Sequence, residues 1–178
     1  AGIIERVGAG VADLSPGDEV VVNSSQDWAS RGEVPLGEYG VGYKILGFPD
    51  HGTFAEQIII NQHQVEPKPA FLDWREAAAL CLVGITTYRA LFTEGRLEAG
   101  QTVAIPGIGG GAATQALLYA KAAGARTVVT SRSTDKLELA RKLGANLAVP
   151  SDGNWGQAVR DFTDGRGADI VIETVGEA

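Results

Sequence analysis

The sequence has little that would cross-link it, hold it in a membrane or attach it to nucleic acid. Among its 178 residues there is one cysteine, Cys81, which cannot form an internal disulfide or a zinc site built from several cysteines. No apolar run approaches the ~20 residues needed to cross a bilayer, so we expect no membrane partner. The formal net charge of -7 argues against a nucleic-acid partner, which requires clustered Lys and Arg. The single thiol and the absence of a visible secretory leader favour a reducing, cytoplasmic location.

The composition changes near residue 73. Before it, glycines and prolines separate short β-branched runs, which predict strands at residues 2–7, 19–22 and 53–60 and an extended segment at 65–69. Residues 23–50 contain many glycines and little periodicity, which is typical of a long surface excursion. The first part of the chain is therefore predicted to be β structure.

A helix is expected to begin at Asp73, whose side chain can accept hydrogen bonds from free backbone N–H groups. Glu76 lies three positions later, where the second carboxylate of a capping box belongs. We expect this helix to run through Leu80 and a second helix to cover residues 86–93.

After residue 101 strands and helices alternate regularly. Strands are predicted at residues 102–105, 126–130, 146–149 and 168–173, and helices at 110–123, at 134–143 and after the capping residue Asn154. This alternation predicts parallel strands joined by crossover helices, and the uniform apolarity of the strands indicates that both faces are covered. The expected fold is a doubly wound α/β sheet whose ligand site lies at the carboxyl ends of the strands.

The run Gly107-Ile108-Gly109-Gly110-Gly111-Ala112 follows the first of these strands and opens a helix. In that context the glycine pattern indicates a dinucleotide-binding turn. Gly107 permits a sharp turn, Gly109 leaves room for a pyrophosphate, and Ala112 lets the helix approach the sheet. The helix N-terminus then offers N–H donors to the phosphates. The alternative is a tight strand–helix turn that binds nothing.

The end of the second strand bears on the choice of coenzyme. Sites selective for NAD usually carry Asp or Glu there, whereas this chain has Ser131-Arg132-Ser133, with Lys136 one helical turn further on. Hydroxyls and cations can bind the 2′-phosphate that a carboxylate would repel, so we predict NADPH. The alternative is that Arg132 and Lys136 are solvated charges at a helix start.

Several segments together resemble one known family. Residues 1–8, 16–20, 52–56, 84–88 and the glycine turn occur in the order found in the medium-chain dehydrogenase/reductases, which include zinc alcohol dehydrogenases and quinone oxidoreductases. The resemblance implies that residues 1–72 are part of a GroES-like catalytic domain and that residues 73–178 are a Rossmann cofactor-binding domain without its last strands. Because members of the family are about twice as long, we expect an internal fragment, inactive alone, of a homodimer or homotetramer.

The sequence departs from the zinc-dependent members. These carry a catalytic Cys two residues before the glycine that corresponds to Gly84, where this chain has Leu82. Cys81 is one residue away, a rotation of about 100° on a helix. The four cysteines of the structural-zinc lobe are absent from residues 23–46, and His51 and His63 lack metal-ligand spacing. We therefore expect the zinc-free branch, similar to quinone oxidoreductases and enone reductases.

The resemblance also implies roles near the nicotinamide. It places Thr86 there, with a hydroxyl that can donate to the nicotinamide or the substrate, and Tyr88 as a second candidate; packing is an equal alternative for both. Thr174-Val175-Gly176, after the fourth strand, is expected to approach the ring. The predicted reaction is NADPH-dependent hydride transfer to a small quinone, enone or carbonyl compound without zinc. The alternatives are a zinc-containing alcohol dehydrogenase and a non-catalytic NADPH-binding relative.

Overall fold

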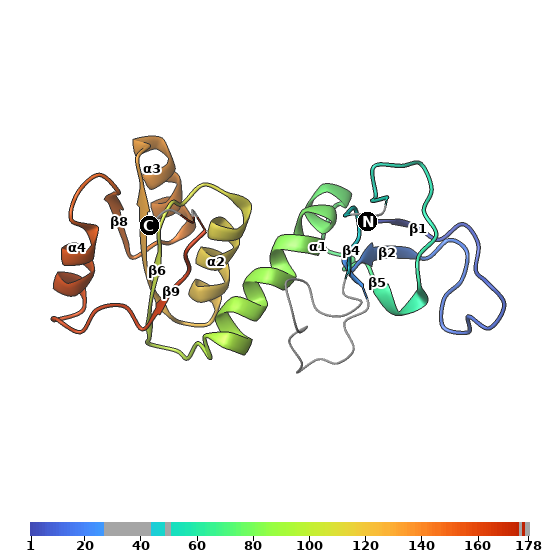
Figure 1. Cartoon of the computed structure of the whole chain (residues 1–178), viewed down its shortest axis with the longest axis horizontal. Coiled ribbons are helices and arrows are strands. Elements are labelled where there is room, and N and C mark those ends of the chain that lie inside the picture. The colour runs from blue at the N-terminus through green and yellow to red at the C-terminus, as the bar shows by residue number, and fades with distance from the viewer. Residues whose placement is uncertain (27–43, 49–50, 175, 177–178) are drawn as a thin grey trace. The chain divides into compact units, whose positions relative to one another are not determined.

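The structure is a computed structural model that describes residues 1–26, 44–48, 51–174 and 176. It contains two compact units, Ala1–Leu82 and Val83–Ala178, coloured from blue to green and from green to red in Figure 1. The boundary between them falls inside helix α1 (Trp74–Tyr88). Most of the excursion expected at residues 23–50 lies outside the described residues. In the part of the chain that is described, no helix has the length and apolarity that a membrane span requires.

The first unit contains two small antiparallel sheets. One has the order β1-β2-β5, built from β1 (Gly2–Ile3), β2 (Glu19–Val22) and β5 (Val65–Pro67). The other pairs β3 (Ser25–Gln26) with β4 (Lys44–Ile45). A short 3-10 helix, η1 (Gln62–Gln64), leads into β5. The predictions of β2 and of the extended segment at 65–69 are confirmed, and β1 is shorter than predicted.

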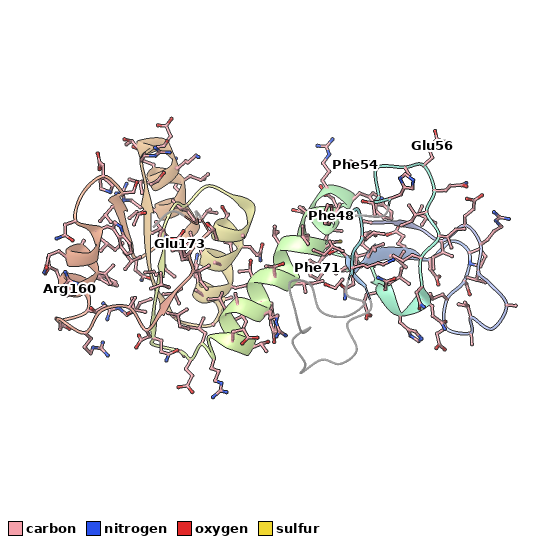
Figure 2. The ribbon with its side chains drawn as sticks, in the orientation of Figure 1. Phe48, Phe54, Glu56, Phe71, Arg160 and Glu173 are labelled. Atoms are coloured by element: carbon pink, nitrogen blue, oxygen red, sulfur yellow. The ribbon has the colours of Figure 1, made fainter. Side chains whose placement is uncertain are left out.

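The predicted strand at residues 53–60 is wrong. The chain there is irregular, and the side chains of Phe54 and Ile59 are exposed; Phe54 is labelled in Figure 2. A strand needs a neighbouring edge to pair with and a face to bury. Among the described residues, no strand pairs with this segment, so its β-branched composition alone does not produce one.

Helix α1 begins with the predicted capping box. The Asp73 carboxylate accepts hydrogen bonds from the N–H groups of Arg75 and Glu76, both at 2.8 Å, and the Glu76 carboxylate accepts from the Asp73 N–H at 3.0 Å. The two predicted helices are one, because α1 continues through Gly84 into a π-helical turn, η2 (Arg89–Glu94). Glycine in a helix interior costs about 1 kcal/mol, but Gly84 is buried, and packing outweighs that propensity.

The second unit is built on a four-stranded parallel sheet with the order β8-β7-β6-β9. Its strands are β6 (Thr102–Ile105), β7 (Arg126–Ser131), β8 (Leu147–Pro150) and β9 (Ile170–Val171). Three helices connect them: α2 (Gly111–Ala122), α3 (Thr134–Leu143) and α4 (Trp155–Phe162). The predicted alternation is confirmed, with bounds shifted by a residue or two. The chain moves outward from β6 to β8 and then returns to β9 beside β6, so the strand order reverses at β6.

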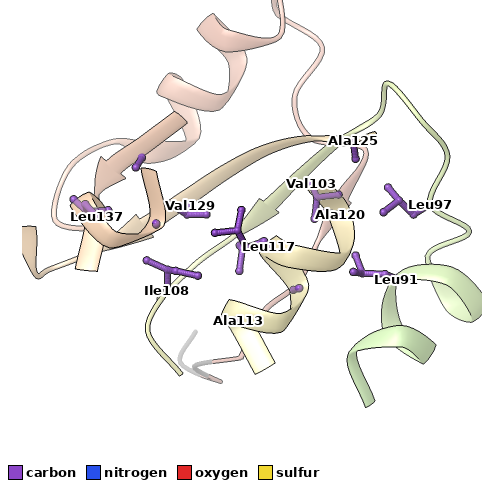
Figure 3. Close-up of a cluster of buried hydrophobic side chains, with 14 residues drawn as sticks. Leu91, Leu97, Val103, Ile108, Ala113, Leu117, Ala120, Ala125, Val129 and Leu137 are labelled. Atoms are coloured by element: carbon purple, nitrogen blue, oxygen red, sulfur yellow. The ribbon is translucent and has the colours of Figure 1, made fainter. Parts of the chain in front are cut away.

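Apolar side chains cover both faces of this sheet. Val103 and Val129 belong to the cluster that also contains Leu117 of α2 and Leu137 of α3 (Figure 3). The intervening residues of the same strands, Ala104 and Val128, join Val159 of α4 in a second cluster. Helices therefore pack on both faces, as the uniformly apolar strands predicted. The doubly wound sheet is confirmed.

Candidate functional site

The glycine turn connects β6 to α2 in a conformation that favours glycine. Gly107 has a φ of 71° and Gly109 a φ of 129°, both in the region that side chains with a Cβ rarely adopt. Gly110, the N-cap of α2, is extended, and α2 begins at Gly111. Gly109 and Gly110 are exposed, so the backbone of the turn is open to solvent.

The neighbouring strand β7 holds the turn through two hydrogen bonds to Thr130. The Gly107 N–H donates to the Thr130 hydroxyl at 3.2 Å, and the Ile108 N–H donates to the Thr130 carbonyl oxygen at 2.7 Å. Thr130 is 2% exposed and Ile108 4%, so the isoleucine is an anchor in the core beneath the glycines. Sequence reasoning missed Thr130; its only signal was its place near the end of the β-branched run of β7.

The start of α2 provides free backbone donors beside the turn. Its first intrahelical hydrogen bond runs from the Thr114 N–H to the Gly110 carbonyl oxygen at 3.0 Å. The N–H groups before Thr114 have no intrahelical acceptor, and the helix dipole is positive at this end. Free N–H groups and a positive potential together suit an anion such as a phosphate.

Small residues at the start of α2 serve close packing on two sides. Ala113 is buried in the core cluster, whereas Ala112 is half-buried, so the close approach to the sheet expected of Ala112 falls to Ala113. The Thr87 hydroxyl donates to the Ala112 carbonyl oxygen at 3.5 Å. A Cβ on Gly111 would lie 3.3 Å from the Val83 side chain. The turn therefore also fits closely against the end of α1.

The serines after β7 organise the start of α3. Ser131 is buried, and its hydroxyl oxygen accepts from the Ser133 N–H at 3.1 Å. The Ser133 hydroxyl oxygen accepts from the Lys136 N–H at 3.4 Å and caps α3. Because each oxygen accepts, each hydroxyl keeps its own hydrogen to donate. Arg132 lies between them and is exposed.

Lys136 extends from the first turn of α3 to the glycine turn. A Cβ built on Gly109 would meet the Lys136 side chain at 2.6 Å for Cδ, 2.9 Å for Cε and 3.0 Å for Nζ. Within the described part of the chain no carboxylate forms an ion pair with Lys136. The structure therefore brings Lys136 and the glycine turn together.

The segment after β9 lies at the same edge of the sheet as the glycine turn. β9 pairs with β6 in parallel, so the residues after both strands leave from adjacent carboxyl ends. Thr174 is exposed, and the Gly176 N–H donates to the Glu173 carboxylate at 3.4 Å; Glu173 is labelled in Figure 2. Val175, also predicted to lie near the nicotinamide, falls outside the described residues. This edge, where the strand order reverses, is where doubly wound sheets bind ligands.

The two predicted catalytic residues lie on α1. Thr86 is exposed. Tyr88 is 56% exposed, with its ring 4.8 Å from that of Phe92 and 6.2 Å, edge-on, from that of Tyr119. Tyr88 thus has a packing role in this aromatic cluster, with more than half of its surface still accessible.

The positions that zinc-dependent relatives use do not offer a zinc site. Leu82 is 53% exposed and has a hydrocarbon side chain without a donor atom. The Cys81 thiol donates to the Ala77 carbonyl oxygen at 3.2 Å within α1. No three His, Cys, Asp or Glu side chains in the described ranges lie close enough together to hold a metal ion. Among the described residues, the position where zinc-dependent relatives carry a cysteine therefore supplies no zinc ligand.

Two family models match the chain. Residues 1–70 match the alcohol dehydrogenase GroES-like domain, and residues 111–178 match the zinc-binding dehydrogenase family. The first match bears out the expected part of a GroES-like domain. One match lies within each unit of the structure, and residues 71–110 lie outside both matches.

Individual relatives agree with these matches. A zinc-type alcohol dehydrogenase-like protein of Schizosaccharomyces pombe is 34% identical over 99% of this chain and 51% of its own length. The crotonyl-CoA reductase of Streptomyces avermitilis is 32% identical over 99% of this chain and 44% of its own length. The crystal structure of an NAD-dependent alcohol dehydrogenase superposes with a TM-score of 0.86 at 35% identity, over 98% of this chain and 52% of that one.

The chain spans about half the length of the curated relatives it matches. Within that span, the order of elements, the glycine turn at the reversal of the sheet and the two family matches agree. The chain belongs to the medium-chain dehydrogenase/reductase family.

Proposed function

We propose that the protein is an NADPH-dependent oxidoreductase that transfers hydride to a quinone, enone or carbonyl substrate without zinc. The observation that carries the proposal is the glycine turn: two glycines with positive φ, an open backbone and a helix N-terminus at the reversal point of a parallel sheet. A side chain at Gly109 would be strained by its positive φ, and its Cβ would lie 2.6 Å from Cδ of Lys136. Residues 107–112 would hold the pyrophosphate.

The preference for NADPH rests on the end of β7. Ser131, Arg132 and Ser133 stand where a site selective for NAD carries a carboxylate. Arg132 is exposed, and both serine hydroxyls retain a hydrogen to donate. A charged hydrogen bond contributes about 1.5–3 kcal/mol, or roughly 10- to 150-fold in affinity. One similar solved structure is that of an NAD-dependent alcohol dehydrogenase, so the preference for NADPH over NADH has to be measured.

The bound coenzyme would supply the hydride, and the chain would supply position and hydrogen bonds. The segment after β9 starts beside the glycine turn, and its residues Thr174 and Gly176 would support the nicotinamide. Val175, which lies outside the described residues, is proposed to act with them. The Thr86 hydroxyl would donate to the nicotinamide or to the substrate oxygen. Tyr88 is the second candidate for that donor, because more than half of its surface stays accessible although its ring packs against Phe92 and Tyr119.

A second candidate is a zinc-containing alcohol dehydrogenase. The zinc-binding dehydrogenase match and the zinc-type relative favour it, whereas Leu82 and the missing ligand cluster in the described residues oppose it. Elemental analysis of the purified protein separates the two. Zinc at one or two equivalents per chain would support the second candidate and overturn the zinc-free proposal.

Activity is proposed for the whole protein, which we expect to act as a homodimer or homotetramer in the cytoplasm. We keep the division into a catalytic part at residues 1–72 and a cofactor-binding part at 73–178 as part of the proposal. The test follows NADPH oxidation against a panel of quinones, enones and aldehydes. Oxidation with at least one class supports the proposal. Tight NADPH binding with no oxidation across the panel would identify a non-catalytic relative instead.

A further inference from the structure

The chain contains two Asp-Gly bonds, Asp152-Gly153 and Asp164-Gly165, which differ in how the structure holds them. An Asp-Gly bond can rearrange without an enzyme, when the glycine nitrogen attacks Cγ of the aspartate side chain. Glycine has no Cβ to obstruct that approach, and its backbone is conformationally permissive. The reaction therefore depends on whether the glycine N–H is engaged in a hydrogen bond and whether the aspartate can turn toward it.

The Asp164-Gly165 bond lies in a hydrogen-bonded turn that follows α4. The Gly165 N–H donates to the Arg160 carbonyl oxygen at 2.8 Å, so the attacking nitrogen already has a partner. Two residues later, the Gly167 N–H donates to the hydroxyl of the buried Thr163 at 2.8 Å. Asp164 itself has a φ of 54°, in the left-handed region. The turn therefore holds both groups that would have to move for the reaction.

The Asp152-Gly153 bond lies in the turn between β8 and α4. Both residues are exposed, and a Cβ on Gly153 would meet no atom within 4 Å. In the part of the chain that is described, no acceptor receives the Gly153 N–H, and no hydrogen bond or ion pair holds the Asp152 carboxylate. The attacking nitrogen and the carboxyl group are therefore both unrestrained at this bond.

We propose that Asp152 is a site of spontaneous isoaspartate formation and that the fold protects Asp164 from the same reaction. The Gly153 nitrogen forms a bond to Cγ of Asp152, and the carboxyl hydroxyl leaves as water with the proton of that nitrogen. Water then adds to the α-carbonyl carbon of the resulting succinimide and breaks the original peptide bond. No atom is gained or lost overall, and the chain now runs through Cβ and Cγ, with the α-carboxylate free.

The product lengthens the chain by one backbone atom between two fixed points. On one side the Ser151 N–H donates to the Ser131 carbonyl oxygen at 3.1 Å, at the end of β7. On the other side the Asn154 side chain accepts from the Gln157 N–H at 3.1 Å and caps α4. The added atom has to be accommodated between these bonds. The inference does not depend on the proposed function.

The test follows isoaspartate in the purified protein during prolonged incubation at neutral pH. Trypsin places the two bonds in separate peptides, residues 143–160 and 161–166, because cleavage follows Lys142, Arg160 and Arg166. Isoaspartate leaves the peptide mass unchanged and shifts its chromatographic retention, whereas deamidation of an asparagine raises the mass. Isoaspartate should accumulate about fivefold or more faster in 143–160 than in 161–166, the factor that corresponds to one backbone hydrogen bond. In denaturant the two peptides should react at similar rates.

Two variants check the chemistry, with circular dichroism to show that each is folded. Asp152→Glu keeps the charge but would need a larger ring, so isoaspartate in 143–160 should disappear. Gly153→Ala places a methyl group in open space and should slow the reaction without disturbing the turn. Equal rates at the two bonds of the folded protein, or isoaspartate that persists in Asp152→Glu, would overturn the proposal. So would a difference that persists in denaturant, because the fold would then not be what protects Asp164.

Discussion

Replacing Thr130 by valine tests whether β7 holds the glycine turn in its binding conformation. Valine has nearly the shape of threonine but cannot accept the hydrogen bond that the Gly107 N–H donates to the Thr130 hydroxyl at 3.2 Å. Because Thr130 is 2% exposed, water cannot readily take the place of the lost acceptor. The second bond, from the Ile108 N–H to the Thr130 carbonyl oxygen, involves only the backbone and remains.

The size of the effect follows from two opposing contributions. An N–H group left without a partner costs about 1–3 kcal/mol. The additional buried methyl group offsets about 0.8 kcal/mol of that cost. The net cost of the substitution is about 1 kcal/mol. If this cost falls on the conformation of the turn that binds the coenzyme, the affinity for NADPH falls about fivefold.

The assay is a fluorescence titration with NADPH, together with thermal unfolding to show that each variant is folded. Thr130→Ser is the matched control, because it keeps the hydroxyl and loses the methyl group instead. We expect Thr130→Ser to lose some stability while binding NADPH nearly as the wild type does. If Thr130→Val binds NADPH as tightly as the wild type, or more tightly than Thr130→Ser, the hydroxyl does not hold the turn.

Three substitutions test the scaffold around the site by chemical denaturation. Leu117→Ala removes a fully buried side chain and should cost about 2–5 kcal/mol, whereas Leu118→Ala, at a position 37% exposed, should cost about 1 kcal/mol or less; equal losses would contradict the packing of α2. Gly95→Ala places a Cβ 2.9 Å from two backbone carbonyl oxygens and should cost about 1–3 kcal/mol, whereas Gly153→Ala meets open space; a harmless Gly95→Ala would refute the tight turn. Asp73→Ala should cost about 0.5–2 kcal/mol, and unchanged stability would mean that the capping box contributes nothing.

The parallel unit could be predicted almost completely from the sequence. Strands β6, β7 and β8 are each followed by a helix that packs against the sheet, and stop signals lie at the ends of these helices. Gly144, for example, ends α3 in the left-handed conformation, and Ser133 caps its start. Local patterns therefore agree with the tertiary structure throughout this unit.

The first unit was less predictable because its strands depend on distant partners. β2 pairs with β5, with Val20 opposite Pro67, although residues 23–64 separate the two strands in the sequence. Residues 53–60 have strand-like composition, but no described strand pairs with them. Composition reports the tendency to form a strand and does not report whether a partner edge exists.

The candidate site, too, could be predicted from the sequence only in part. The positions of the glycines and of Arg132 follow from the motif and the strand ends. The contact between Lys136 and Gly109 and the bond from Gly107 to Thr130 depend on how α3 and β7 lie beside the turn. Sequence spacing placed Lys136 next to Arg132, whereas packing places its ammonium group at the turn.

The central claim is that the glycine turn and the end of β7 form a site for NADPH. Its most direct test is the ratio of the Kd values for NADH and NADPH, measured by titration for the wild-type protein and for Arg132→Ala. We predict that the wild type binds NADPH roughly 10- to 150-fold more tightly and that Arg132→Ala removes this preference. Equal affinities in the wild type, or tighter binding of NADH, would contradict the claim.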